Sequence, residues 1–370
     1  MTDLFDAGRL GRLALRNRIV MAPMTRSRAG DLDEPTPIVA DYYRQRASAG
    51  LIVTEGIYPS ADGKGYCRTP GLVTKAQVEG WRRVTDGVHA EGGTIVAQLM
   101  HCGRVAHADN KAPDAETVAP SAIRARGDMY TDTAGMQPFS EPRALALEEI
   151  PGVVAEYARA TELAYEAGFD GVEAHCASGY LPAQFLSTGT NQRSDAYGGS
   201  LEGRLRFPLE VLRAMAAVDG ADRVGFRICP GNPFNDLSDE DPVGTFEAFL
   251  AAVRDLGLAY CHVIRLNSIP NAPDIDNVAL AERAFGGPLI VNDSYDLEEA
   301  RAVVAAGHAE AVAFGRAYIG NPDLVDRLRT GAPLARFDPK RLYSPGPEGY
   351  TDYPTLTESA DRDRPAADPA

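Results

Sequence analysis

The chain has 370 residues, 44% hydrophobic and 24% charged, which allows one large domain or two ordinary ones. Its formal net charge of -15 argues against a nucleic-acid surface and against binding to anionic membranes. The five scattered cysteines form no C-x-x-C pair, so no disulfide framework, iron–sulfur cluster or other metal site is predicted. Neither a secretory signal nor a membrane-length apolar run is apparent, and a cytoplasmic location is expected.

Short runs rich in Val and Ile alternate with longer amphipathic stretches along the chain. These runs are typical of strands buried on both faces, and they lie at 18–23, 50–56, 94–100, 169–175, 223–229, 258–264, 288–292 and 310–315. Apolar residues at helical spacing occupy 75–93, 148–168 and 296–307, each between two of the strands. Strands with intervening helices predict an α/β fold, a (β/α)8 TIM barrel, formed by a single domain of residues 1–356.

The main alternative is a doubly wound open sheet, which a dinucleotide-binding G-x-G-x-x-G sequence after the first strand would support. That sequence is absent, because the first strand continues into PMTRSRAG. The long segment 101–147, after the third strand, is predicted to form a lid over the barrel mouth. LGRLALRN, before the first strand, is expected to form a hairpin at the barrel bottom, and 357–370 a disordered acidic tail.

Polar residues gather where the predicted strands end, and the carboxyl ends of barrel strands carry the chemistry in this fold. Thr25 follows the first strand, Gly56 ends the second and Gln98 lies near the end of the third. Together they form a surface that could cradle a planar ring with N–H and C=O groups at its edge. Taken singly, each of these residues also fits ordinary loop or core chemistry.

Arg227 is the most informative residue of this set, because its strand is expected to be covered on both sides. An unpaired guanidinium in such a place is costly and requires a counter-charge. Two partners would satisfy it: a bound anionic ligand, or a structural ion pair with Glu173 on another strand.

The last two strand–helix junctions, VNDSYD at 291–296 and FGRAY at 314–318, occupy the usual phosphate position of such barrels. Each leads into a helix N-terminus, whose free backbone N–H groups attract anions, and Arg316 adds a cation. The alternative is a surface Arg316 paired with Asp323. A polar-edged planar ring with one phosphate describes flavin mononucleotide (FMN).

The chain resembles the old yellow enzyme family, the FMN-dependent ene-reductases, and within it the bacterial NAD(P)H-dependent branch. The resemblance covers about residues 3–356 and rests on NRIVMAPMTRSRA, PTPIVADYYRQRASAGLIVTEG, GFDGVEAH, NQRSDAYGGSLEGRLRF, AVAFGRAYIGNPDL and EGYTDYP. It implies that the flavin is lined or held by Pro23, Met24, Thr25, Gly56, Gln98 and Arg227, and its phosphate by Gly315, Arg316 and backbone N–H groups of Asp293 and Ser294. Arg227 would stabilise negative charge on N1 of the reduced flavin.

The same resemblance gives roles to HCASGY at 175–180. His175 and Ser178 would hold the oxygen of an activating carbonyl or nitro group, and Tyr180 would protonate the substrate carbon. The positions that line the family's substrate pocket are matched here by Tyr66, Met100 and Tyr343.

Three positions depart from the family pattern. Ser178 stands where asparagine or histidine is usual and reaches less far, and Met100 replaces a common tryptophan and widens the pocket. Asp293 carries a carboxylate that should repel phosphate unless it points away. Cys102 and Cys176 flank the site and are expected to be core residues.

The leading hypothesis is an FMN-dependent oxidoreductase that passes hydride from NAD(P)H to an electron-poor alkene, such as an enone, an enal or a nitro compound. One alternative is a dedicated biosynthetic flavoenzyme, an isomerase, dehydrogenase or reductase of one bulky intermediate, because the anchoring pair is altered. A second is a non-catalytic barrel that has lost FMN. We expect a monomer or homodimer with a small-molecule substrate, and neither nucleic acid nor membrane as a partner.

Overall fold

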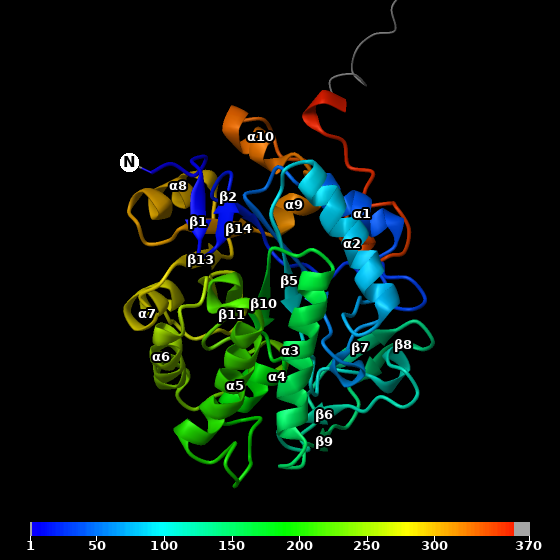
Figure 1. Cartoon of the computed structure of the whole chain (residues 1–370), viewed down its shortest axis with the longest axis vertical. Coiled ribbons are helices and arrows are strands. Elements are labelled where there is room, and N and C mark those ends of the chain that lie inside the picture. The colour runs from blue at the N-terminus through cyan, green and yellow to red at the C-terminus, as the bar shows by residue number, and fades with distance from the viewer. Residues whose placement is uncertain (1, 359–370) are drawn as a thin grey trace, which may run out of the picture.

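The eight expected strands form the centre of the protein in the computed structural model, which describes residues 2–358. They close into a parallel barrel in the order β3 (Ile19–Met21), β4 (Leu51–Ile57), β5 (Ile95–Leu99), β10 (Gly171–His175), β11 (Val224–Ile228), β12 (Tyr260–Ile264), β13 (Leu289–Asn292) and β14 (Ala311–Phe314). The predicted (β/α)8 barrel is therefore confirmed, and Figure 1 shows its helices around the strands.

Helices connect successive barrel strands, and the last two helices follow β14. They are α1 (Pro37–Arg44), α2 (Lys75–Ala90), α3 (Ile150–Glu166), α4 (Leu181–Leu186), α5 (Leu201–Asp219), α6 (Pro242–Val253), α7 (Asn277–Ala284), α8 (Leu297–Ala305), α9 (Arg316–Gly320) and α10 (Leu324–Thr330). Capping boxes at Thr74 and Asp296 start α2 and α8 by satisfying backbone N–H groups of the first turn. The three helices expected from apolar spacing all form, as α2, α3 and α8, and each ends two or three residues before the expected end.

The hairpin of β1 (Gly8–Leu10) and β2 (Leu13–Leu15) closes the amino-terminal end of the barrel. Its leucines Leu10, Leu13 and Leu15 are buried in one cluster with inward-facing strand residues such as Val20 and Val53. Alternate strand residues pack outward against the helices. The expected hairpin at the barrel bottom is confirmed.

The long insertion between β5 and α3 carries two small sheets. One pairs β6 (Val118–Ala119) with β9 (Arg143–Ala144), and the other is an antiparallel hairpin of β7 (Asp128–Thr131) and β8 (Gly135–Pro138). Residues of this hairpin line a cavity at the barrel mouth, so the insertion covers the mouth as expected. The main hydrophobic core cluster includes residues from Leu4 to Tyr350. That residues 1–356 form a single domain remains a prediction. Residues 359–370 of the expected disordered tail lie outside the described residues.

Close packing inside the barrel depends on Gly225 on β11. A Cβ atom there would come within 2.2 Å of the ring of Tyr260, which is fully buried. Gly225→Ala is therefore expected to lower the free energy of unfolding by about 1–3 kcal/mol, as overpacking does. Chemical denaturation at equilibrium measures this change.

Gly152→Ala is the matched control, because no heavy atom lies within 4 Å of its Cβ position in α3. Alanine favours a helix over glycine, so this control is expected to be neutral or slightly stabilising. Equal unfolding free energies for the two variants would contradict the packing of Tyr260 against Gly225.

Candidate active site

Two cavities at the carboxyl ends of the barrel strands form one groove. The smaller, of about 430 Å³, lies between the ends of β13 and β14 and the loop after β3. The larger, of about 900 Å³, extends from that loop to the end of β10 and the β7–β8 hairpin. The cavities share the lining residues Pro23, Thr25, Arg227 and Tyr343.

Every residue that the sequence placed in the site lines this groove. The smaller cavity adds Met24, Asp293, Ser294, Gly315 and Arg316, and the larger adds Gly56, Tyr66, Gln98, Met100, His175, Ser178 and Tyr180. Parallel barrel strands end at a common rim, and this explains why residues so distant in the sequence meet here. Their proximity is a property of the structure, while their individual roles remain proposals.

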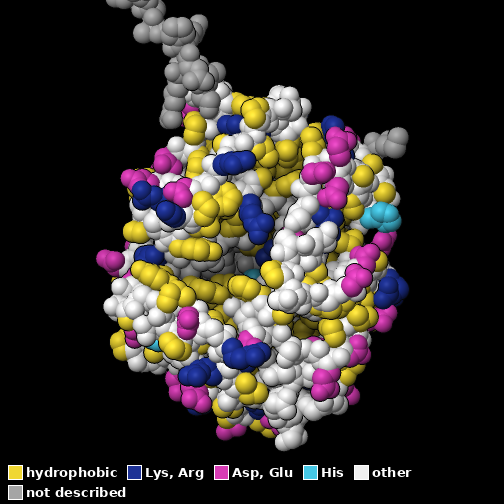
Figure 2. All heavy atoms as spheres, turned by 180° about the vertical axis from the view of Figure 1, so that it is seen from behind, with side chains coloured by type: hydrophobic (Ala, Val, Ile, Leu, Met, Phe, Trp, Pro, Cys, Tyr) yellow, Lys and Arg dark blue, Asp and Glu magenta, His cyan; other side chains and the backbone are white. Residues whose placement is uncertain are grey.

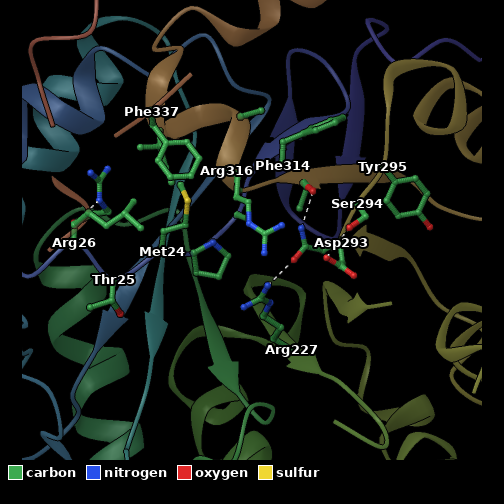
Figure 3. Close-up of a pocket in the computed structure, with 18 of the residues that line it drawn as sticks. Met24, Thr25, Arg26, Arg227, Asp293, Ser294, Tyr295, Phe314, Arg316 and Phe337 are labelled. Carbon is green, nitrogen blue, oxygen red and sulfur yellow. Dashed lines mark hydrogen bonds between the residues drawn. The ribbon is translucent and has the colours of Figure 1, made fainter. Parts of the chain in front are cut away.

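Arg227 is buried and lines both cavities. Figure 3 shows its guanidinium among the residues of the smaller cavity. It donates a hydrogen bond to Asn292 Oδ1 at 2.7 Å, and its Nε has no hydrogen-bond partner among the described residues. Burial lowers the pKa of this guanidinium, and Glu173 is the foremost group that opposes the lowering. A buried donor without a partner at the edge of a cavity fits a ligand that accepts hydrogen bonds or carries negative charge.

Glu173 does not form the direct ion pair with Arg227 that the sequence left open. Its carboxylate instead accepts hydrogen bonds from His262 Nδ1 at 2.9 Å and from Gln98 Nε2 at 2.7 Å. Burial acts to raise the pKa of Glu173, but His262, Arg227 and Gln98 outweigh it and hold that pKa below its ordinary value. Glu173 is therefore a buried anion that supports Arg227 from a distance.

This anion also fixes the amide of Gln98. A carboxylate only accepts hydrogen bonds, so the amide nitrogen of Gln98 must face Glu173. The carbonyl oxygen of Gln98 is then free to accept a hydrogen bond from a ligand in the larger cavity, which Gln98 lines.

The turn after β13 resolves the expected conflict between Asp293 and a phosphate. The Asp293 carboxylate accepts hydrogen bonds from the backbone N–H of Ser268 at 3.0 Å and from the Ser268 hydroxyl. The backbone of Asp293 and Ser294 has positive φ values of 87° and 56°, a conformation that favours glycine. The carboxylate is thus held by the loop after β12, while the backbone of the turn has a conformation that glycine adopts most readily.

Arg316 extends into the smaller cavity (Figure 3). The expected alternative, a pair with Asp323, does not form, because the Asp323 carboxylate accepts a 2.7 Å hydrogen bond from Arg327 Nε. Arg316 is exposed and makes no ion pair within residues 2–358, so its charge is available to an anion in this cavity.

His175 ends β10, and its ring is uncharged. Burial, followed by the charge of Arg227, lowers the pKa of His175 well below its ordinary value. The backbone N–H of Ala177 donates to His175 Nδ1 at 3.3 Å, so the ring proton must lie on Nε2. His175 therefore offers a neutral N–H donor to the larger cavity that it lines.

Tyr180 packs edge-on against His175, with 4.6 Å between ring centroids. Its hydroxyl lies 3.0 Å from the hydroxyl of Tyr66. Burial, followed by Tyr66, raises the pKa of Tyr180 well above its ordinary value. Tyr180 is therefore protonated at neutral pH and can act as a proton donor.

Ser178 lines the larger cavity with a φ of 57°, and Asn235 braces it. Asn235 Nδ2 donates to the Ser178 carbonyl oxygen at 2.8 Å. The β11–α6 loop that carries Asn235 is held by Arg104, which donates to the Asp236 carbonyl oxygen at 2.5 Å. Sequence reasoning missed Asn235, whose only signal is the tolerance of asparagine for positive φ, here 59°.

The C-terminal segment 341–348 is held at the mouth by arginines that sequence reasoning also missed. Arg28 donates to four of its carbonyl oxygens, those of Arg341, Leu342, Gly346 and Glu348. Arg68 donates to the Tyr343 carbonyl oxygen at 2.9 Å and pairs with Asp132 of the β7–β8 hairpin. These contacts fix Tyr343 over both cavities.

Gly56 lines the larger cavity, and a Cβ atom there would lie 2.4 Å from Met100 Cε, so Gly56 makes room for Met100. That Gly56 admits a flat ligand remains a prediction. Cys102 and Cys176 are buried core residues as expected. Burial raises the pKa of Cys102 to about 12 and raises that of Cys176 further, which leaves both thiols unreactive.

Comparison with known proteins agrees with this geometry. A family model described as the NADH:flavin oxidoreductase / NADH oxidase family matches residues 3–335. A probable flavin mononucleotide-dependent alkene reductase of Leishmania infantum is 42% identical over 351 residues, 94% of this chain and 96% of the relative.

Two solved structures have nearly the same fold as this chain. Morphinone reductase in complex with tetrahydroNAD has a TM-score of 0.91 and 44% identity, covering 96% of this chain and 98% of that chain. The old yellow enzyme homologue from Zymomonas mobilis has a TM-score of 0.92 and 39% identity, covering 96% and 100%.

The chain therefore belongs to the NADH:flavin oxidoreductase / NADH oxidase family, the old yellow enzyme family. It is an FMN-dependent oxidoreductase with NAD(P)H as reductant. Among the described residues, no helix is long and apolar enough to cross a membrane, and no cluster of His, Cys, Asp and Glu could hold a metal ion.

The brace on Ser178 generates a prediction. Asn235→Asp keeps the size and the backbone conformation but replaces the amide donor with a carboxylate that faces the Ser178 carbonyl oxygen. An unsatisfied group costs about 1–3 kcal/mol, so kcat/KM for an alkene substrate is expected to fall roughly fivefold or more. Steady-state kinetics at saturating NADPH measure this change.

Asn271→Asp is the matched control, because Asn271 is an exposed asparagine with the same φ of 59° and lies outside the groove. It is expected to leave kcat/KM unchanged. If both variants behaved like the parent protein, Asn235 would have no part in shaping the site.

Proposed function

We propose that this chain reduces electron-poor alkenes, namely enones, enals and nitroalkenes, at the groove described above. The observation that carries the proposal is the pairing of a neutral His175 Nε2–H donor with the protonated hydroxyl of Tyr180 in one cavity. FMN bound in the adjoining space would accept hydride from NAD(P)H and deliver it to the substrate carbon.

The residues of the groove fit FMN. The unpartnered Nε–H of Arg227 and the free carbonyl oxygen of Gln98 match the alternating acceptors and donors on the polar edge of the flavin ring. In our proposal Pro23, Met24 and Thr25 line the ring. Its phosphate is held by Arg316, Gly315 and the backbone N–H groups of Asp293 and Ser294.

The chain's own groups complete the chemistry. His175 donates its Nε2–H to the carbonyl or nitro oxygen and so draws electron density away from the alkene. Ser178 supplies a second, shorter donor beside it. As hydride arrives at one alkene carbon, Tyr180 gives its proton to the other carbon, and the double bond becomes a single bond. The Tyr66 hydroxyl, 3.0 Å from that of Tyr180, can stabilise the resulting phenolate.

The alternatives considered from the sequence have less support. The relatives include an alkene reductase, which favours reduction over isomerisation or dehydrogenation. A barrel without FMN would have no reason to keep both Arg227 and Arg316 free of direct carboxylate partners. We further propose a cytoplasmic location, because all five cysteines are free and buried and the reaction consumes NAD(P)H. A monomer or homodimer remains the expected assembly.

Separate half-reactions test the role of Tyr180. In anaerobic stopped-flow experiments, Tyr180→Phe is expected to leave reduction of the bound flavin by NADPH nearly unchanged. Reoxidation by cyclohexenone should slow by about 100-fold or more, because a general acid contributes at least that much.

Tyr66→Phe is the matched variant, since it removes the neighbouring hydroxyl and keeps the proton donor. It should slow reoxidation less than Tyr180→Phe does. Equal losses in both half-reactions of Tyr180→Phe, or an unchanged reoxidation rate, would remove Tyr180 from the role of proton donor.

A further inference from the structure

Exposed apolar side chains gather at the outer edge of the larger cavity. Tyr130 is 50% exposed, Met136 60%, Phe234 56% and Tyr343 57%, and all of them line that cavity. We call these side chains the apolar rim. Figure 2 shows hydrophobic side chains around a hollow on one face of the molecule, with basic side chains visible inside it.

The hairpin presents its part of the rim in a defined register. Tyr130 and Met136 lie directly opposite each other in the β7–β8 pairing. Along β7, Met129 and Thr131 are buried and Tyr130 is exposed, as the alternation of a strand requires. Both exposed positions of this cross-strand pair could carry polar groups at no cost in packing, yet both are large and apolar.

The rim is fixed rather than loose, because arginine contacts hold the segments that carry it. Arg68 joins the hairpin to the C-terminal segment through Asp132 and the Tyr343 carbonyl oxygen. Arg104 holds the loop of Phe234 through the Asp236 carbonyl oxygen. A preformed apolar surface binds an apolar group without first having to be ordered.

The larger cavity has both polar and apolar lining. His175, Ser178 and Tyr180 supply hydrogen-bonding groups, and Met100 and the rim supply apolar surface. Arg68, Asp128, Asp132 and Lys340 add charged groups, of which Arg68 and Asp132 pair with each other. Large apolar side chains that line a binding cavity and are exposed to solvent mark a place where the apolar part of a ligand can leave water.

We infer that the substrate is an unsaturated carbonyl compound with a large apolar body, and that the apolar rim binds this body. The inference rests on the proposed function and specifies its substrate class. The apolar body does not change during the reaction, so its contacts lower KM and leave kcat nearly unchanged.

A series of straight-chain unsaturated aldehydes of increasing length tests the inference, with cyclohexenone as the small reference substrate. With the FMN-loaded protein, KM is expected to fall roughly two- to fourfold for each added methylene that reaches the rim, at nearly constant kcat. In the double variant Met136→Ser/Phe234→Ser the dependence of KM on chain length should largely disappear. Leu334→Ser, at an exposed leucine outside the groove, is the control and should keep it.

The possible failures are distinguishable. A KM that does not depend on chain length, together with turnover of cyclohexenone, would overturn the rim and leave the proposed function standing. Absence of any turnover by FMN-loaded protein would reject the proposed function itself. The inference would also be overturned if the dependence of KM on chain length survived in the double variant. Loss of a homodimer in that variant during size-exclusion chromatography would assign the rim to subunit contact and overturn it as well.

Discussion

The site depends on a buried guanidinium that has no carboxylate bonded to it. Arg227 is held in place by Asn292, whose amide nitrogen in turn donates to the Ala313 carbonyl oxygen at 2.7 Å. The nearby anion, Glu173, is occupied by His262 and Gln98. The barrel thus places a fixed cation between two cavities, while the nearby carboxylate of Glu173 binds and orients the amide of Gln98. Charges fixed in advance in this way need no reorganisation when a ligand's charge develops.

Arg227 also affects the larger cavity, which it lines together with His175. Next to burial, the charge of Arg227 is the main cause of the lowered pKa of His175, so the ring stays neutral and keeps the Nε2–H that substrates would meet. In the proposed function, cofactor binding and substrate polarisation would both depend on this one buried charge. The braces from Asn235, Arg104, Arg28 and Arg68 act at longer range, because they fix the loops that carry the remaining lining residues.

The strands could be predicted from the apolar pattern, and the site residues at strand ends because the barrel topology makes those ends converge. Tyr66, Ser178, Tyr180 and Tyr343 were indicated by the family resemblance instead. Arg227, His175 and Gln98 needed only their positions at or near the ends of strands to be placed together. The braces could not be predicted, because a contact such as Arg28 with Gly346 spans most of the chain and depends on loop conformation. The local sequence also gives no signal for the direction of the Asp293 carboxylate. Nor does it show that Met100 occupies the space beside Gly56.

The most direct test separates ligand binding from structural support at Arg227. We would measure the unfolding free energy of the FMN-free protein and its FMN affinity, for the parent and for Arg227→Met, which nearly conserves volume. If the cation serves the cofactor, the apoprotein should be as stable as the parent, and FMN should bind roughly 10–100-fold more weakly. An apoprotein destabilised by about 3–5 kcal/mol, as when a buried ion pair is broken, with unchanged FMN affinity would contradict this role.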